Sequence, residues 1–230
     1  MITVPVGEDA SFRYEFNRII HLWSGMAQTL LENAARLSEY LAGLTDFVVV
    51  KEMDGNYGHM GATIADAILQ AGLNYETVVR PRISRIRAEY PDARTTSAFS
   101  TLLDTAGVKE VLNWRDDVKP NRVRGLTAFL LAEKIETETE LALWLTNDEN
   151  RRRLRTVSGI GPKTLDYIGI VVGEQTTAVD RHILGILEQA SISCDSYDAA
   201  RDTVNAAADL MRVQRALLDH SIWRYMRVAP

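Results

Sequence analysis

The sequence predicts an all-α protein, and three observations lead to that prediction. Apolar residues recur at steps of three and four along most of the 230 residues, which is the spacing of an amphipathic helix. Glycine and proline breaks separate these periodic segments. A single short β-branched run, residues 47–51, could be a lone strand or an extended connector. We therefore expect a bundle of about ten short helices, without an internal repeat or a long linker.

In the first half of the chain, the helical pattern is clearest from residue 12 to residue 44, where Gly25 and Gly43 could break or end the helix. Residues 52–61 are polar and rich in glycine, so they form the next expected loop. A proline break follows at residues 91–95. The helices expected in this half cover residues 12–44, 62–69, 76–89, 97–105 and 108–114.

Capping residues help to place the helices of the second half. Asn147 and Asp180 each precede an apolar periodic segment, and both residue types accept hydrogen bonds from the free N–H groups at a helix start. We expect a turn at residues 174–177. The helices expected in this half cover residues 119–132, 138–145, 148–157, 181–190, 197–210 and 212–227, with one more directly after the glycine turn described below.

The composition narrows the class of protein. It is 46% hydrophobic and 25% charged, as in ordinary globular proteins, and the length allows one large or two small domains. Cys194 is the single cysteine, which excludes a disulfide within the chain and a four-cysteine iron–sulfur cluster. No apolar run reaches membrane-spanning length and the first residues lack a secretory pattern, so we expect a cytoplasmic protein without a membrane partner.

The charge pattern leaves two interpretations open. A net charge of −5 disfavours a protein that coats nucleic acid without selection. Two arginine clusters could still form a local basic surface, or they could be solvated helix faces. His21, His59 and His220 show no metal-ligand spacing, so we expect no metal and no cofactor. The clusters are Arg80, Arg82, Arg85 and Arg87, and Arg151, Arg152, Arg153 and Arg155.

The most informative segment is a glycine turn between two expected helices, Gly159-Ile160-Gly161-Pro162. Glycines let a ligand approach the main chain, and Pro162 suits the first turn of a helix. Free N–H groups at the turn and the helix start can bind a DNA phosphate, with Thr164 as a further donor. We expect Ile160 to pack inward. The turn is neither a P-loop nor a dinucleotide fingerprint, because the required glycines and a preceding strand are missing.

Two ionisable residues follow this turn, Lys163 and, 17 positions later, Asp180. Taken singly, Lys163 could be a solvated lysine or a phosphate contact, and Asp180 could be a plain helix cap. In one cleft, however, an amine and a carboxylate can break the bond between a base and its sugar. A neutral lysine attacks the C1′ atom, and a carboxylate stabilises the positive charge that develops on the sugar. Partial burial gives a lysine the lowered pKa that this attack needs.

The turn with its lysine, followed by Val179-Asp180-Arg181-His182, resembles the helix–hairpin–helix DNA glycosylase superfamily, which includes endonuclease III and 8-oxoguanine DNA glycosylase. The specific likeness covers residues 151–187. It implies a single glycosylase domain over residues 1–230, in which two helical subdomains flank a DNA-binding cleft. A helical barrel with the hairpin would cover residues 62–176, and the terminal helices would form the second subdomain. The four-cysteine cluster of endonuclease III is absent, so the likeness is to cluster-free members.

The resemblance also implies an activity and a partner. The partner is double-stranded DNA with a damaged or modified base, and the chain acts as a monomer. The enzyme removes the base and nicks the strand by AP-lyase chemistry, through a Schiff base on Lys163 with the help of Asp180. Relatives with only the aspartate use water, so a monofunctional glycosylase is an alternative, as is a non-catalytic DNA-binding protein. The motif does not identify the excised base. The implied phosphate contacts are Gly159, Gly161, Thr164 and His182.

A further family feature is a polar side chain that fills the gap left by the flipped base. Gly72 falls near that position by spacing, so the role passes to Gln70, Asn74 or Tyr75, or these residues serve only loop packing. Tyr57 in the glycine-rich loop could stack on a base. Core positions are expected for Trp144 and Trp223. Asp219 and His220 in the last helix could face the cleft, but a structural role is the expected one.

Overall fold

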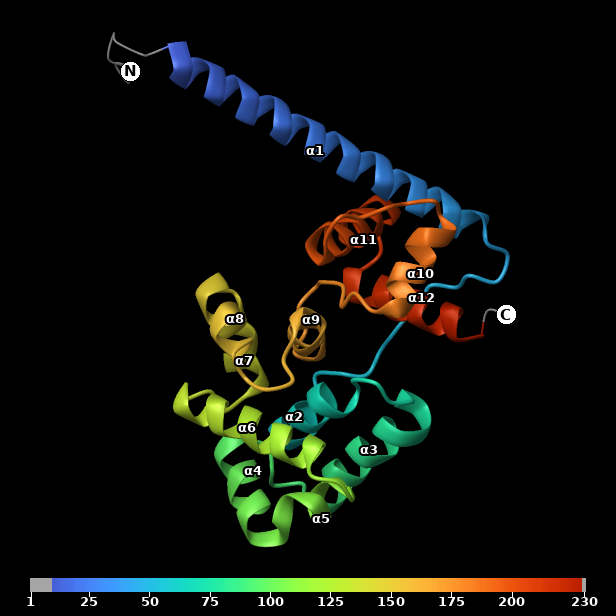
Figure 1. Cartoon of the computed structure of the whole chain (residues 1–230). Coiled ribbons are helices and arrows are strands. Elements are labelled where there is room, and N and C mark those ends of the chain that lie inside the picture. Colours follow the sequence, from blue (N-terminus) through green and yellow to red (C-terminus); the bar gives the residue numbers. More distant parts are fainter. Residues whose placement is uncertain (1–9, 229–230) are drawn as a thin grey trace.

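The computed structural model describes the backbone of residues 10–228 and the side chains of residues 27–227. Within these residues every regular element is helical, so the predicted all-α class is confirmed (Figure 1). They form twelve α-helices and two π-helical turns, close to the number of helices expected. The first helix is not short, because α1 runs through Gly25 for 34 residues. The side chain of His21 lies outside the described residues.

The helix ends lie close to the expected positions, with two corrections. Helix α8 stops at Leu154, where the chain enters the glycine turn. Helix α12 starts only at Arg215, because Arg212 ends α11 in the left-handed conformation, which cannot begin a helix. The elements are α1 (Ala10–Gly43), α2 (Met60–Leu69), η1 (Tyr75–Val79), α3 (Arg80–Glu89), α4 (Thr96–Leu102), η2 (Leu103–Gly107), α5 (Val108–Leu112), α6 (Val118–Ala132), α7 (Glu138–Leu145), α8 (Asp148–Leu154), α9 (Pro162–Val171), α10 (Arg181–Gln189), α11 (Tyr197–Met211) and α12 (Arg215–Val228).

Side-chain caps determine where several of these helices begin. Asn147 accepts hydrogen bonds from the first turn of α8, and Asp180 does the same for α10, so both predicted caps are confirmed. Thr137 and Glu140 form a reciprocal capping box at the start of α7. The beginning of α9 differs from these, because Gly161 has no side chain to offer.

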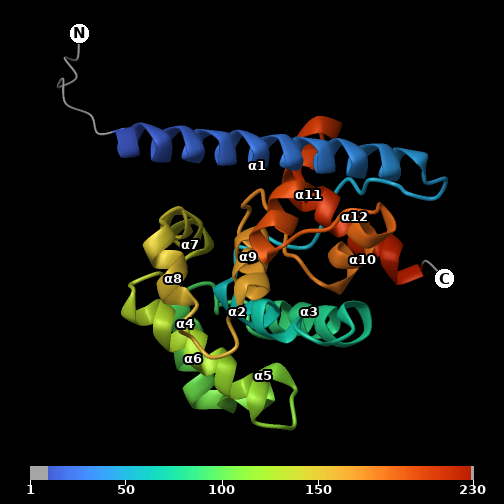
Figure 2. The same ribbon diagram turned by 45° about the horizontal axis from the view of Figure 1, so that its top comes forward.

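Buried apolar side chains form two main clusters, and each gathers a different set of helices. The first core takes its residues from α2 to α9, between Met60 and Val172. The second core joins the end of α1 to α10, α11 and α12. Figures 1 and 2 show the two sets of helices one above the other, with α1 lying along α11. A small third cluster of Ile170, Ala178 and Ala216 packs with Met53 and Tyr167, and it brings a residue of α9 together with one of α12.

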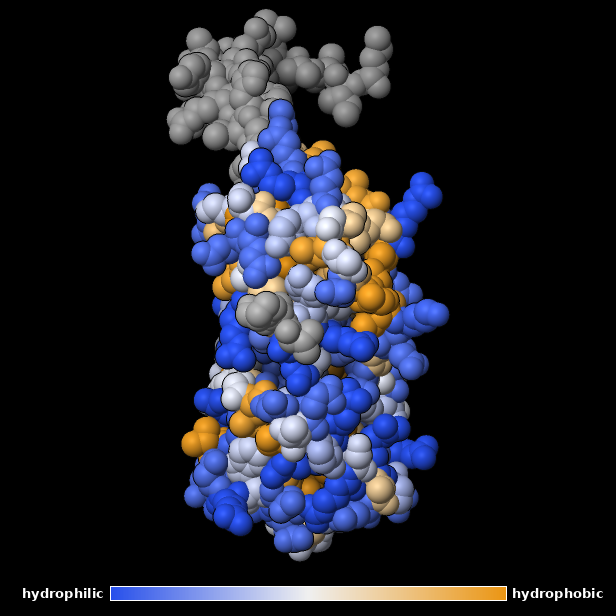
Figure 3. All heavy atoms as spheres, turned by 90° about the vertical axis from the view of Figure 1, so that its right-hand side faces the viewer, coloured by the Kyte–Doolittle hydropathy of each residue, from blue (hydrophilic) through white to orange (hydrophobic). Residues whose placement is uncertain are grey.

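The segment between α1 and α2 is a connector rather than a strand. The N–H group of Val50 donates to Ser221 Oγ of α12 over 3.0 Å, so the connector is held against the second core. Figure 3 shows polar side chains over most of one face of the molecule, with the larger apolar group in the half that contains α1 and the terminal helices. No helix among the described residues is long and apolar enough to cross a membrane.

Candidate active site in the pocket between the two cores

A pocket with a volume of about 480 Å³ lies where the two sets of helices meet. Drug-sized ligands occupy pockets of about 300–1,000 Å³. We call the part that belongs to α2, η1, α9 and their loops the first wall, made of Gln70, Asn74, Tyr75, Lys163 and Tyr167. The part that belongs to α10 and α12 is the second wall, made of Asp180, Arg181, His182, Asp219, His220, Trp223 and Arg227.

The glycine turn places Lys163 at the edge of the first wall. Gly159 has φ +88, which favours glycine, and Ile160 is 4% exposed because it packs in the first core as predicted. Pro162 opens α9, and no side chain caps the free N–H groups of its first turn. These donors therefore remain without a capping side chain, while the next residue, Lys163, lines the pocket.

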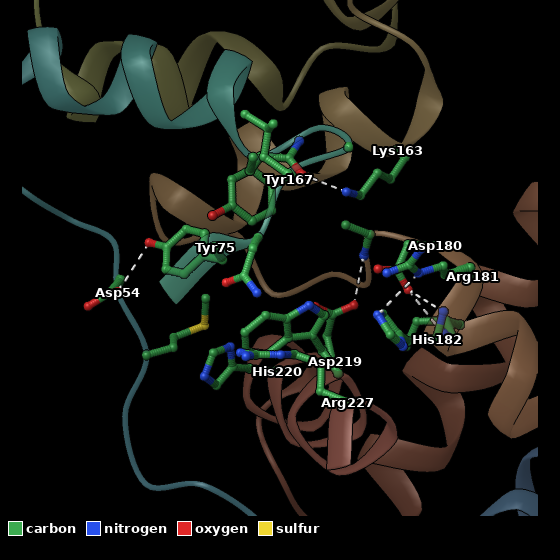
Figure 4. A pocket seen from close by; sticks show the side chains of 18 residues that line it. Asp54, Tyr75, Lys163, Tyr167, Asp180, Arg181, His182, Asp219, His220 and Arg227 are labelled. Atoms are coloured by element: carbon green, nitrogen blue, oxygen red, sulfur yellow. Dashed lines mark hydrogen bonds between the residues drawn. The ribbon is translucent and has the colours of Figure 1, made fainter. Parts of the chain in front are cut away.

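Lys163 is the cationic group of the first wall. Its Nζ atom donates to Gln70 Oε1 over 2.5 Å and lies 6.0 Å from the centre of the Tyr167 ring (Figure 4). Burial lowers the pKa of the amine, and the carboxylates of Asp180 and Asp219 act in the opposite direction. The neutral form, which is the nucleophilic one, is therefore easier to reach than for a solvated lysine.

Asp180 has features of both roles considered for it, a helix cap and a carboxylate that lines the pocket. Its Oδ1 atom accepts hydrogen bonds from the N–H groups of His182 (2.8 Å) and Ile183 (3.1 Å), so the residue does cap α10. Its second oxygen, Oδ2, has no hydrogen-bond partner among the described residues, and Asp180 lines the pocket. His182 lines the same wall, and burial lowers its pKa. A cap and a reactive carboxylate are therefore compatible in one residue.

Asp219 is a second carboxyl group in the pocket, for which a structural role was expected. It accepts the N–H of Ala178 through Oδ1 over 3.1 Å. Burial, and then the charge of nearby Asp180, raise the pKa of Asp219 to about 8. At neutral pH Asp219 therefore holds its proton, and it does so beside the carboxyl group of Asp180. The sequence carried a signal, because Asp219 interrupts the apolar pattern of α12.

A fully buried carboxyl group supports the first wall from behind. Asp66 of α2 is 0% exposed, and its oxygens accept hydrogen bonds from the hydroxyls of Tyr57 (2.7 Å), Tyr75 (3.4 Å) and Tyr167 (3.2 Å). Burial raises the pKa of Asp66 to about 7, while the hydroxyl donors act against that rise. Tyr75 also donates to Asp54 Oδ2 over 3.1 Å. Two of the three tyrosines line the pocket, so Asp66 holds their rings in place.

Aromatic side chains cover the rest of the second wall, which corrects the expectation that Trp223 belongs to the core. Trp223 lines the pocket, with His220 stacked on it at 5.2 Å and the guanidinium of Arg227 4.5 Å from its centre. The edge of Tyr75 approaches it from the first wall at 6.2 Å. Trp144, by contrast, packs against the first core as expected.

The remaining candidate residues divide between the pocket and its surroundings. Gln70 and Asn74 line the pocket, although Asn74 also caps η1. Gly159 and Gly161 lie outside it, on the turn, and Thr164 is only 6% exposed. Tyr57, a candidate for base stacking, is instead bonded to Asp66 behind the wall.

The two arginine clusters are largely engaged within the protein. In the first, Arg80 pairs with Asp54 and Glu76, and Arg85 with Glu89 and Glu110. In the second, Arg151 pairs with Asp166 and Glu174, Arg152 with Glu149, and Arg153 with Glu133. These contacts favour the interpretation of paired helix faces over that of a free basic surface.

The comparison with protein families gives one match. Residues 35–227 match a family described as a domain of unknown function (DUF8548). The match includes every residue of both walls. No curated protein matches the chain. In the described part of the chain, no group of three histidine, cysteine or carboxylate side chains is placed to hold a metal ion.

Proposed function

The chain belongs to the DUF8548 family, and we propose that it is a DNA glycosylase with AP-lyase activity. One observation carries the proposal: Lys163 and Asp180, which belong to different helices, line the same pocket. In this proposal the helices of the first core correspond to the barrel that carries the hairpin. The helices of the second core correspond to the terminal subdomain, and DNA lies across the mouth of the pocket. The cytoplasm is its expected location and the monomer its active form.

The pocket suits a nucleobase that has left the DNA stack. Flipping costs a few kcal/mol, least for a damaged or mispaired base. The aromatic side chains of Tyr75 and Trp223 line the space that such a base would enter, and Gln70 and Asn74 offer amide groups that can read its edge. Neither wall selects a particular lesion by its residue types alone, so the substrate class is a damaged or modified base.

The reaction begins with the neutral amine of Lys163. Its Nζ atom forms a bond to C1′ while the bond from C1′ to the base nitrogen breaks, and the departing base takes that electron pair. Asp180 stabilises the positive charge on the sugar and accepts the proton released by the amine. Asp219 holds its proton at neutral pH, so it supplies the proton that the leaving base requires.

The second half of the reaction cuts the strand. The bond from C1′ to the ring oxygen opens and leaves an imine between Lys163 and the sugar. Asp219, which has given its proton to the leaving base, then accepts a proton from C2′, and the 3′ phosphate leaves with the electron pair of its bond to C3′. Water hydrolyses the imine and releases Lys163. These steps use groups that line the pocket together with water, and none requires a metal or a redox cofactor.

A monofunctional glycosylase is the alternative that a specific contact favours. The 2.5 Å hydrogen bond from Lys163 Nζ to Gln70 Oε1 could hold the amine away from the sugar, so that Asp180 would activate water instead. A non-catalytic DNA-binding protein would use the hairpin alone.

Borohydride trapping distinguishes these possibilities. Wild-type protein, incubated with a panel of lesion and abasic duplexes and sodium borohydride, should form a covalent protein–DNA adduct, because the hydride reduces the imine to a stable amine. Lys163→Gln should form none, and Lys51→Gln, which removes an exposed lysine, should match wild type. Base release without an adduct would establish the monofunctional alternative. Binding without release from any duplex would leave the non-catalytic one.

A further inference from the structure

The space above the glycine turn is occupied by an arginine from another helix. A Cβ atom added at Gly159 would lie 2.6 Å from Cδ and 2.8 Å from Nε of Arg122, which belongs to α6. The side chain of Arg122 therefore lies directly on the backbone of the turn. A phosphate that approaches this turn therefore meets a guanidinium group above Gly159 and not the bare main chain alone.

Arg122 differs from the neighbouring arginine of the same helix in its partners. Arg124 donates to Asp104 Oδ1 and to the carbonyl oxygen of Leu103, both over 2.7 Å. Arg122 is half-buried, yet it makes no hydrogen bond or ion pair with the described residues. Its five N–H donors therefore remain available at the surface of the turn.

Arg122 belongs to a group of three cations with Lys119 and Lys163, in which the charges of Arg122 and Lys163 both act on Lys119. Lys119, one helical turn earlier, donates from Nζ to the carbonyl oxygens of Ile68 (2.6 Å) and Ala71 (2.8 Å) at the end of α2. Burial, and then the charges of Arg122 and Lys163, lower the pKa of Lys119 to about 8, while the charge of Asp116 acts in the opposite direction. None of the three cations forms an ion pair with a carboxylate of the described residues. Like charges gathered in this way repel one another until an anion binds among them.

We propose that Arg122 is a phosphate contact of the glycine turn, so that the DNA backbone meets its guanidinium above Gly159 together with the free N–H groups at the start of α9. The inference rests on the proposed function, since it takes the DNA phosphate as the ligand. A planar guanidinium can bind two phosphate oxygens at once, which a single N–H donor cannot do. Lys119 stays on the carbonyl oxygens of α2 and adds positive charge at the turn.

The salt dependence of DNA binding measures this contact without any reaction. The probe is a fluorescent duplex with a tetrahydrofuran abasic site, titrated with the full chain at a series of salt concentrations. Each phosphate that a protein neutralises contributes about 0.9 to the slope of log K against log salt. Arg122→Gln should therefore lower the slope by about 0.9 and weaken binding several-fold at low salt. Arg122→Lys should keep most of the slope.

Arg124→Gln is the matched control, because it removes the same charge from the same helix at a residue already paired with Asp104. Its slope should equal that of wild type. Equal slopes for Arg122→Gln and Arg124→Gln, with both proteins folded by circular dichroism, would overturn the role of Arg122 and leave the glycosylase proposal standing. If wild type binds no abasic or lesion duplex, the proposed function and this inference both fail.

Discussion

The two walls of the pocket differ in how far the protein itself satisfies their polar groups. In the first wall, Lys163 is bonded to Gln70, and the tyrosine hydroxyls are bonded to the buried Asp66. In the second wall, Asp180 and Asp219 each use one oxygen to accept backbone N–H groups, and the other oxygen has no partner among the described residues. The first wall therefore sets the shape of the pocket, and the second keeps hydrogen-bonding capacity for a ligand.

The largest effect should come from the second wall. Asp180→Asn should slow base release by roughly 10²–10⁴-fold, the usual contribution of a positioned acid or base. Asparagine also caps helices well, so α10 should stay intact and the urea midpoint should hardly move. Single-turnover release from a duplex that wild type cleaves gives the rate. An unchanged rate would reduce Asp180 to a helix cap.

Removal of the carboxyl group behind the first wall, that of Asp66, should affect the stability of the fold more than the reaction. Asp66→Ala leaves the hydroxyls of Tyr57 and Tyr167 without their acceptor, while Tyr75 keeps its hydrogen bond to Asp54, and each unsatisfied buried donor costs about 1–3 kcal/mol. We expect a loss of about 3 kcal/mol or more in the free energy of unfolding at pH 6, measured with urea. Asp104→Ala, at an exposed ion pair, should lose less than about 1 kcal/mol. A similar loss in both variants would contradict the supporting role of Asp66.

The pH dependence of stability should reveal the proton on Asp219. Its pKa in the folded protein is raised to about 8, whereas an aspartate of the unfolded chain titrates near its ordinary value of about 4. Between these two pH values the folded protein holds a proton that the unfolded chain has released. Stability from this group is therefore fully present at low pH and is lost as the pH rises toward 8. Wild type should lose stability relative to Asp219→Asn by about 1.4 kcal/mol per pH unit within that window. Parallel curves for the two proteins would show that Asp219 is ionised.

The smallest effect should come from a hydroxyl behind the first wall. Tyr57→Phe removes one donor to Asp66 without touching the pocket, so it should cost about 1 kcal/mol of stability and leave substrate affinity unchanged. Tyr40→Phe removes an exposed hydroxyl bonded to Gln189 and should cost almost nothing. A fall in affinity for Tyr57→Phe would show that the network tunes the pocket as well as supporting it.

Much of the local structure could be predicted because local forces decide it. The period of apolar residues located nearly every helix, and the caps at Asn147 and Asp180 lie where their side chains predicted them. The predicted start of α12 was wrong, because Arg212 has a left-handed backbone conformation that the sequence pattern did not indicate, and the helix begins only at Arg215. No local pattern distinguishes a strand from a connector in residues 47–51, and contact with α12 decides it.

The candidate site also contains residues that the sequence singled out and residues that it did not. Lys163 and Asp180 stand out in the sequence because an amine and a carboxylate follow a glycine turn at a recognisable spacing. Asp66 was missed and Asp219 was assigned a structural role before a place in the cleft, since a polar residue in an apolar helix can face either a core or a pocket. Trp223 was assigned to the core, although an aromatic residue in an apolar pattern can also line a pocket. Arg122 gave no signal at all, because its partner is a glycine 37 positions away on another helix.

The sequence by itself determined the helical class, most helix boundaries and the caps, because each depends on residues within one or two turns of one another. It also singled out Lys163 and Asp180 as candidate site residues, through a resemblance that spans their 17 positions. Only the tertiary structure decided that both residues line one pocket, that Asp219 keeps its proton beside Asp180, and that Arg122 lies on the turn. The physical reason is that burial and charge proximity depend on which helices pack together, and that packing sums contacts between residues far apart in the chain.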